Sequence, residues 1–162
     1  SFEIRSVRGC DVAPIDLSDP EAALRLKAYV WPDAPERMQR IDAAIALANE
    51  KAPDVVEMDA DDFVGMNLER PQESGIPRAM FHSIMWQYMP KATQDAITVR
   101  LQEYGELATP ERPLAWVSLE TNPETFRHEL WLRYWNGKDG DGTPTLLANA
   151  HPHGAWVEWL PG

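Results

Sequence analysis

Short apolar segments alternate with amphipathic helical segments as far as Glu120, and this alternation most constrains the fold. The predicted strands cover residues 2–10, 55–58, 79–82 and 114–120. The predicted helices cover residues 19–29, 36–51, 59–69 and 91–105. A crossover helix between two strands brings the chain back to start the next strand in the same direction. The first 120 residues therefore predict a parallel α/β sheet.

After Glu120 the pattern changes to strands that follow one another without helices. These strands are predicted at residues 127–135, 146–150 and 155–160. In the first of them apolar Leu130 and Leu132 alternate strictly with Trp131 and Arg133, so the two sets lie on opposite faces. The pattern predicts an antiparallel C-terminal hairpin at the edge of a mostly parallel, Rossmann-like sheet. With 162 residues the chain is expected to form one domain.

Charge and cysteine content exclude several classes of function. The chain carries 15 Lys and Arg against 26 Asp and Glu, a net charge of −11, and the cations form no cluster in the sequence. Nucleic acid and anionic membrane surfaces both select clustered cations, so we expect neither as a partner. No apolar run reaches the roughly 18 residues that span a bilayer. Cys10 is the only cysteine, which excludes an intrachain disulfide and suggests a cytoplasmic location.

Ligands of doubly wound sheets bind at the carboxyl ends of the strands, so the residues that follow each strand are the first candidates. Asp11 follows the first predicted strand, where a carboxylate can accept both hydroxyls of a ribose. From the residues alone, a turn-forming aspartate is the simpler explanation of Asp11. Asp59 follows the second strand and could meet an adenine amino group, but helix capping explains an acid there as well.

The residues after the third strand are harder to explain by packing alone. They combine an imidazole, a hydroxyl, an amide and two polar aromatic rings: His82, Ser83, Trp86, Gln87 and Tyr88. His82 could act as a base near neutral pH, and the two rings offer flat surfaces with a polar tip. The alternative is an aromatic lid that packs on the edge of the sheet.

Three further groups have simpler explanations. Glu120 is a lone acid at a strand end, where acids are usually solvated. His151 and His153 could share a metal with a third ligand, but we expect a tight turn whose imidazoles bond to the backbone. Cys10 precedes an acid that raises its pKa, which argues against a nucleophile. The sequence contains no glycine-rich phosphate-binding motif and no nucleophile elbow.

Four segments carry a resemblance to a known family. They are residues 8–17, 28–33, 81–88 and 151–159. Through them essentially the whole chain resembles the C-terminal half of the bacterial family catalogued as domain of unknown function 2332, with Ala13 where that family usually has Asn. Longer members of the family carry an upstream glycine-rich turn similar to the first motif of class I S-adenosylmethionine-dependent methyltransferases. That turn does not occur in these residues.

The resemblance implies a methyltransferase-type sheet without its first strand and glycine turn. Asp11 is similar to the acid that holds the cofactor ribose, and Asp59, placed by topology only, to the acid near the adenine. His82 and Tyr88 are the implied catalytic residues. The implied substrate-pocket residues are Ser83, Trp86 and Gln87.

The resemblance therefore implies a methyltransferase-like protein that binds S-adenosylmethionine when whole, whereas this chain alone is expected to be inactive. The expected partner is a small-molecule ligand or a methyl acceptor, with no metal. Loss of a central strand exposes sheet edges, which homodimerisation, rearrangement or pairing with other residues could cover. The main alternative is a non-catalytic binding or scaffold protein on a degenerate Rossmann-like fold. A metal-dependent hydrolase that uses His151 and His153 is a third hypothesis.

Overall fold

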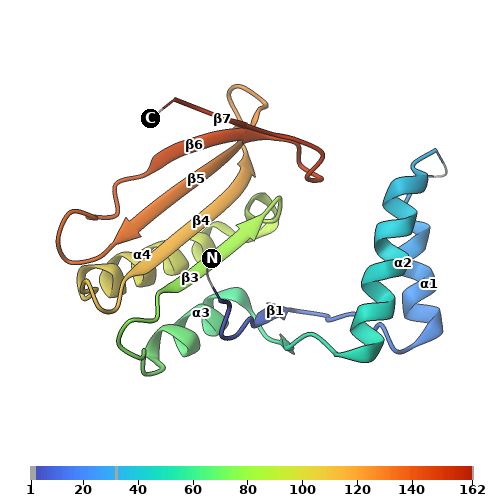
Figure 1. Cartoon of the computed structure of the whole chain (residues 1–162), viewed down its shortest axis with the longest axis horizontal. Coiled ribbons are helices and arrows are strands. Elements are labelled where there is room, and N and C mark those ends of the chain that lie inside the picture. Colours follow the sequence, from blue (N-terminus) through green and yellow to red (C-terminus); the bar gives the residue numbers. More distant parts are fainter. Residues whose placement is uncertain (1–2, 32, 162) are drawn as a thin grey trace. The chain divides into compact units, whose positions relative to one another are not determined.

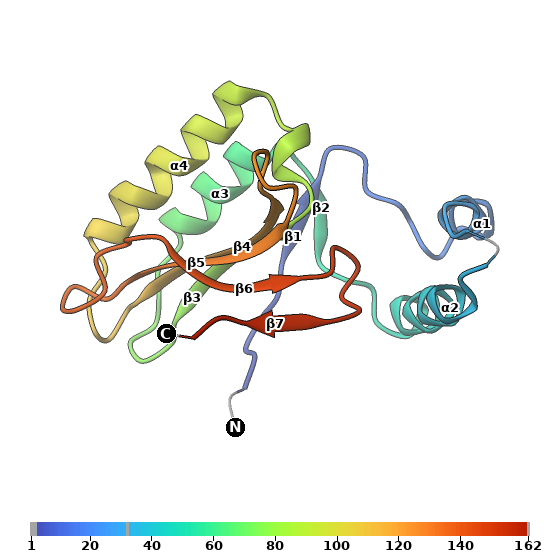
Figure 2. The ribbon, with the colours of Figure 1, turned by 90° about the horizontal axis from the view of Figure 1, so that it is seen from above.

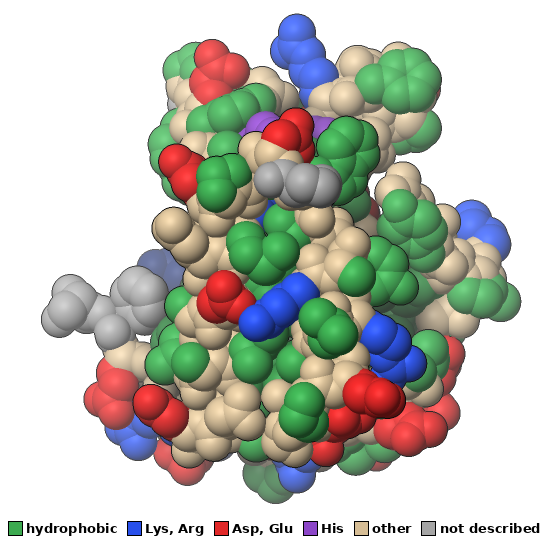
Figure 3. All heavy atoms as spheres, turned by 90° about the vertical axis from the view of Figure 1, so that its right-hand side faces the viewer, with side chains coloured by type: hydrophobic (Ala, Val, Ile, Leu, Met, Phe, Trp, Pro, Cys, Tyr) green, Lys and Arg blue, Asp and Glu red, His purple; other side chains and the backbone are tan. Residues whose placement is uncertain are grey.

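The computed structural model describes residues 3–31 and 33–161, which form two compact units, Ser1–Ala60 and Asp61–Gly162. Figure 1 shows the two units with most of their helices and strands labelled. Among the described residues, no helix is long and apolar enough to cross a membrane. On the face drawn in Figure 3, lysine and arginine side chains lie singly among hydrophobic and acidic ones.

The first unit pairs two short parallel strands and places two helices between them in the chain. Its elements are β1 (Gly9–Asp11), α1 (Pro20–Ala28), α2 (Pro35–Glu50) and β2 (Val55–Glu57). Gly9 pairs with Val55 and Asp11 with Glu57. Helix α1 begins at a cap in which the Asp19 side chain accepts a hydrogen bond from the Glu21 amide, which satisfies one of the free amides of its first turn.

Two features of this unit differ from the prediction. The strand predicted at residues 2–10 is confined to Gly9–Asp11, because only these residues find a partner strand, and Phe2 lies outside the described residues. Helix α2 has no buried residue, and its apolar stripe is only half-buried. Periodicity located the stripe correctly, but the depth of its burial depends on the neighbours that the fold supplies.

The second unit is a five-stranded mixed sheet with the order β3-β4-β5-β6-β7. Its strands are β3 (Arg78–Ser83), β4 (Leu114–Thr121), β5 (His128–Trp135), β6 (Thr145–Ala150) and β7 (Val157–Trp159). Strand β3 runs parallel to β4, and the remaining neighbours run antiparallel. The predicted α/β class is therefore correct, whereas the antiparallel part extends over three strand pairs and is larger than a single hairpin. Each turn after β4 is too short to hold a crossover helix, so each strand returns beside its predecessor.

Helices cover one face of this sheet, as Figure 2 shows for α3 (Ala60–Glu69) and α4 (Lys91–Glu106). Helix α4 buries Ile97, Leu101 and Gly105. Trp135 of β5 is 2% exposed and lies so close to Gly105 that a Cβ there would come within 2.5 Å of the indole. The missing side chain of Gly105 is therefore what lets the helix approach the sheet.

The Arg78 side chain ties α3 to the start of the sheet. Its guanidinium donates to the carbonyl oxygens of Leu68 at 2.9 Å and Arg70 at 2.8 Å. Leu68 lies in the last turn of α3 and Arg70 directly follows the helix, where carbonyl groups have no amide partner within the helix. Arg78 thus fixes the end of α3 against the beginning of β3, the strand that carries His82.

Candidate polar–aromatic site

His82 lies near the end of β3 on the face of the sheet that α4 covers. Its Nδ1 is 2.7 Å from Glu120 Oε1, and its side chain is only 9% exposed. Trp116 Nε1 donates to His82 Nε2 over 3.0 Å. An indole nitrogen can only donate, so Nε2 must be an acceptor and the ring proton must sit on Nδ1. His82 is therefore a neutral imidazole whose two nitrogens both have protein partners.

Glu120, from the end of β4, is the acceptor on which this network converges. Besides His82, its Oε1 accepts hydrogen bonds from the Met85 amide at 3.1 Å and the Trp86 amide at 3.2 Å. Burial raises the pKa of Glu120, but the hydrogen bonds from His82 and the two amides outweigh burial, so that the pKa falls below its ordinary value. The side chain is 17% exposed, so the prediction of a solvated lone acid is wrong.

The turn after β3 aims these two amides. Ile84 has a φ of +50°, in the left-handed region that a β-branched side chain rarely adopts. Its own amide donates to the Leu119 carbonyl at 2.9 Å, which holds the strained residue beside β4. The chain then reverses so that the Met85 and Trp86 amides reach Glu120. The network with Glu120 therefore compensates for backbone strain at Ile84.

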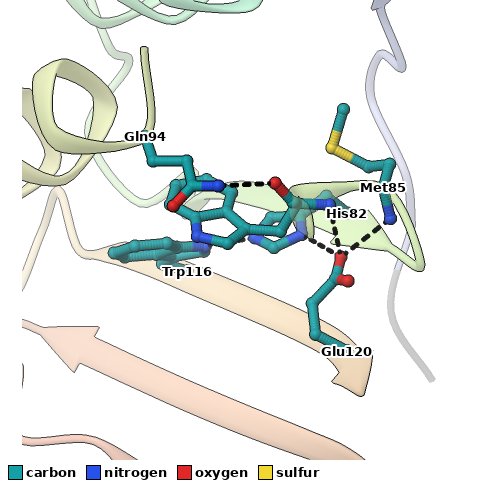
Figure 4. Close-up of polar contacts among 6 residues, drawn as sticks. His82, Met85, Gln94, Trp116 and Glu120 are labelled. Atoms are coloured by element: carbon teal, nitrogen blue, oxygen red, sulfur yellow. Dashed lines mark hydrogen bonds and ion pairs between the residues drawn. The ribbon is translucent and has the colours of Figure 1, made fainter. Parts of the chain in front are cut away.

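Aromatic stacking closes the other side of the imidazole. The rings of His82 and Trp86 are stacked with centroids 4.8 Å apart, and Trp86 lies 5.4 Å from Trp116. Gln94 of α4 donates to the carbonyl oxygens of Trp86 and Met89 at 2.8 and 3.1 Å. Figure 4 shows Gln94, Trp116, Met85 and Glu120 arranged around His82. The short helix η1 (Trp86–Tyr88) is thereby held to both α4 and the sheet.

A hollow of about 240 Å³ adjoins this network on the same face of the sheet. Trp116 pairs across the strands with Arg133, and Ser118 pairs with Trp131. These four residues and Pro144 line the hollow. Trp116 belongs to both features: its indole nitrogen bonds to His82, while the Arg133 guanidinium lies 5.2 Å from its ring centre. The alternation of β5 predicted the shared face of Trp131 and Arg133, and the strand register confirms it.

The structure brings together only two of the residues predicted after the third strand. His82 and Trp86 stack in the network, whereas Ser83, Gln87 and Tyr88 are exposed and do not line the hollow. Ser83 follows His82 on the strand and therefore points to the opposite face of the sheet. The sequence-based reasoning missed Trp116, Ser118 and the pairing of His82 with Glu120. A polar residue on the helix-covered face of a strand was the signal that could have revealed them.

Asp11 and Asp59 belong to the first unit. Asp11 is exposed at the end of β1, and its Oδ1 accepts a hydrogen bond from the Ala13 amide at 2.8 Å, as in a simple aspartate turn. Asp59 is exposed and directly precedes α3, which begins at Ala60. Burial, followed by the charges of Asp11 and Asp59, raises the pKa of the Cys10 thiol. This direction agrees with the prediction that Cys10 is not a nucleophile.

The segment around His151 forms the predicted turn. The His151 Nδ1 atom accepts a hydrogen bond from the His153 amide at 3.1 Å, and the Gly154 amide donates to the His151 carbonyl. The His151 ring also meets Trp156 edge-on, with centroids 6.2 Å apart. Among the residues that the structure describes, no group of three or more His, Cys, Asp or Glu side chains is arranged to hold a metal ion.

Together these features define a mixed-sheet α/β protein with a buried polar–aromatic network beside an open hollow. The family described as an uncharacterised protein conserved in bacteria (DUF2332) matches residues 1–159. The chain belongs to this family. No curated protein and no solved structure matches the chain.

Proposed function

We propose that the chain corresponds to the C-terminal half of a methyltransferase-like protein that binds S-adenosylmethionine when complete. The order of the strands is the observation that carries this proposal. The parallel pair β1–β2 and the parallel pair β3–β4 belong to separate sheets, so β1 and β3 each have one unpaired edge among the described strands. In the methyltransferase order the first strand lies between the strands that correspond to β1 and β3. We therefore propose that an upstream parallel strand of the complete protein pairs with the free edge of β3.

The residues at the ends of these strands fit part of the cofactor. Asp11 Oδ1 accepts the Ala13 amide, which leaves the other carboxylate oxygen for a ribose hydroxyl. Asp59 follows β2, the place near which an adenine lies in a methyltransferase-type fold. The glycine turn that approaches the methionine end is not part of this sequence. The chain therefore supplies ribose and adenine contacts but not the backbone that binds the charged end.

The network geometry restricts what each residue can do in such a reaction. S-adenosylmethionine supplies an electrophilic methyl group, so the protein must orient the acceptor and receive its proton. Both nitrogens of His82 are engaged, which makes His82 a positioning residue for Trp86. Tyr88, 77% exposed, and the neighbouring Gln87 remain the groups on η1 that can meet an acceptor.

Calorimetric titration with S-adenosylmethionine tests the proposal. A longer family member with the glycine turn should bind in the micromolar range, about −8 kcal/mol, whereas this chain alone should show no binding at that level. In the longer protein, replacing the aspartate that corresponds to Asp11 by asparagine should weaken binding at least about tenfold. The matched control replaces the aspartate that corresponds to the exposed Asp33 by asparagine. Absence of binding by the longer protein would refute the proposal.

A non-catalytic binding or scaffold protein is the second candidate. The observation that favours it is that both ring nitrogens of His82 have protein partners, so that His82 has no free nitrogen to act as a base. In that case the longer protein would bind no S-adenosylmethionine, although its polar–aromatic network would be intact.

A further inference from the structure

The hollow beside Trp116 has the chemistry of a binding site for a small anionic ring compound. We infer that it binds an aromatic carboxylate, with the carboxylate on Arg133 and the ring against the indoles of Trp116 and Trp131. This inference rests on the hollow alone and does not depend on S-adenosylmethionine binding.

Arg133 supplies the charge. Its guanidinium lies 5.2 Å from the ring centre of Trp116 and makes no ion pair or hydrogen bond with any described residue. Stacking on one face of the indole leaves the donor edge of the guanidinium available. That planar edge matches a carboxylate through two parallel hydrogen bonds. Arg133 is half-buried at the wall of the hollow, so a carboxylate bound there is partly shielded from water.

The two tryptophans supply ring surface rather than donors, and most of that surface comes from half-buried Trp131, because Trp116 is only 9% exposed. Trp116 Nε1 is committed to His82 Nε2, and Trp131 Nε1 donates to Glu129 Oε2, each at 3.0 Å. These bonds fix both rings before any ligand arrives, which reduces the entropy lost on binding. A planar ring gains contact and dispersion energy against such faces, whereas a puckered ring fits them poorly.

The volume of the hollow and the charges around it restrict the class of ligand further. A hollow of about 240 Å³, open to solvent on one side, suits a ligand with one single or fused ring. Glu120 and Glu129 are opposite each other in the register, two residues beyond Ser118 and Trp131, so the same face carries negative charge nearby. A single guanidinium beside two carboxylates favours a monoanion over a phosphate dianion.

Titrations of the intact chain with four probes test this inference. Benzoate and 2-naphthoate combine a planar ring with a carboxylate, benzamide is planar but neutral, and cyclohexanecarboxylate is anionic but puckered. The readout is the set of indole N–H signals in ¹H–¹⁵N spectra, with those of Trp116 and Trp131 identified by Trp→Phe variants. We expect saturable shifts of these two signals, with a Kd of about 1 mM or lower for 2-naphthoate. Benzamide and cyclohexanecarboxylate should bind at least about tenfold more weakly.

Variants separate recognition from simple packing. Arg133→Gln should weaken 2-naphthoate binding at least about tenfold, and Arg133→Lys should weaken it less, because lysine keeps the charge but not the planar fork. Arg127→Gln, at an exposed arginine just before β5, is the matched control and should have no effect. Equal binding of benzamide and benzoate would overturn the inference, as would full affinity in Arg133→Gln. Shifts that instead centre on the exposed Trp156 and Trp159 would also overturn it. The probe series on the unaltered chain remains decisive if a variant does not fold.

Discussion

Replacing Glu120 tests whether the polar network is a main support of the second unit. Its Oε1 atom accepts three hydrogen bonds, from the His82 ring and from the Met85 and Trp86 amides. Glu120→Ala removes the acceptor and leaves three donors without their protein partner. Glu120→Gln keeps one acceptor oxygen and removes the charge, and its NH2 group takes the place of Oε2, which is buried and has no hydrogen-bond partner among the described residues. The two variants therefore separate the contribution of the hydrogen bonds from that of the carboxylate charge.

The structure sets the expected magnitude. Each unsatisfied donor costs about 1–3 kcal/mol when buried, but the side chain of Glu120 is 17% exposed and water will reach part of the site. We expect Glu120→Ala to lower the free energy of unfolding by about 2–4 kcal/mol. Glu120→Gln should cost about 1–2 kcal/mol, because hydrogen bonds to a charged acceptor are about twice as strong as neutral ones.

The direction of the pKa shift of Glu120 predicts how the stability difference between the native chain and Glu120→Gln changes with pH. The pKa of Glu120 in the folded protein lies below its value in the unfolded chain, because the hydrogen bonds that outweigh burial favour the carboxylate. The charged form therefore stabilises the fold fully above the unfolded pKa, which is about 4.3 for glutamate. This stabilisation is lost as the pH falls through the lower folded pKa. The difference between the native chain and Glu120→Gln should shrink accordingly below about pH 4.

Urea denaturation at several pH values, followed by tryptophan fluorescence, is the assay. Every tryptophan except Trp31 lies in the second unit, so the signal reports mainly on the sheet that holds Glu120. Glu103→Gln, at an exposed position of α4, is the matched control and should change the stability by less than about 0.5 kcal/mol. An effect of Glu120→Gln no larger than this control at neutral pH would refute the reasoning, as would a difference that does not change with pH.

Three further predictions concern other parts of the chain. Gly142 has a φ of +80°, and a Cβ there would overlap the buried indole of Trp135, so Gly142→Ala should cost about 3 kcal/mol in urea denaturation. Gly154→Ala, with a φ of +71° but open space around it, should cost only about 1 kcal/mol, and equal effects would contradict the packing argument. Zinc should not change the melting temperature, because the turn at His151 already uses the ring for a backbone hydrogen bond. A metal ion that stays bound after treatment with a chelator would contradict this prediction. Cys10 should react with iodoacetamide more slowly than a free cysteine at pH 8, because burial and nearby acids raise its pKa, and equal rates would contradict this.

Much of the local structure could be predicted from the sequence because it depends on short-range rules. The strict alternation of β5 placed Trp131 and Arg133 on one face, and the register confirms that face. Helix α4 was predicted within one residue of its observed end at Glu106, since its apolar positions recur at helical spacing. The change from helix–strand alternation to consecutive strands after Glu120 identified the antiparallel part. Its full extent of three strand pairs was not predicted, because strand pairing joins residues far apart in the chain.

The candidate site was decided by tertiary structure. Glu120 gave no sequence signal that it would serve as an acceptor, because its donors come from β3 and the following turn, more than 30 residues earlier. The sequence suggested a free imidazole at His82, whereas the packing of Trp116 against it consumes the second nitrogen. Composition and periodicity report which face a side chain occupies. Which groups meet across that face depends on the pairing of β3 with β4 and of β4 with β5, and only the folded sheet fixes that pairing.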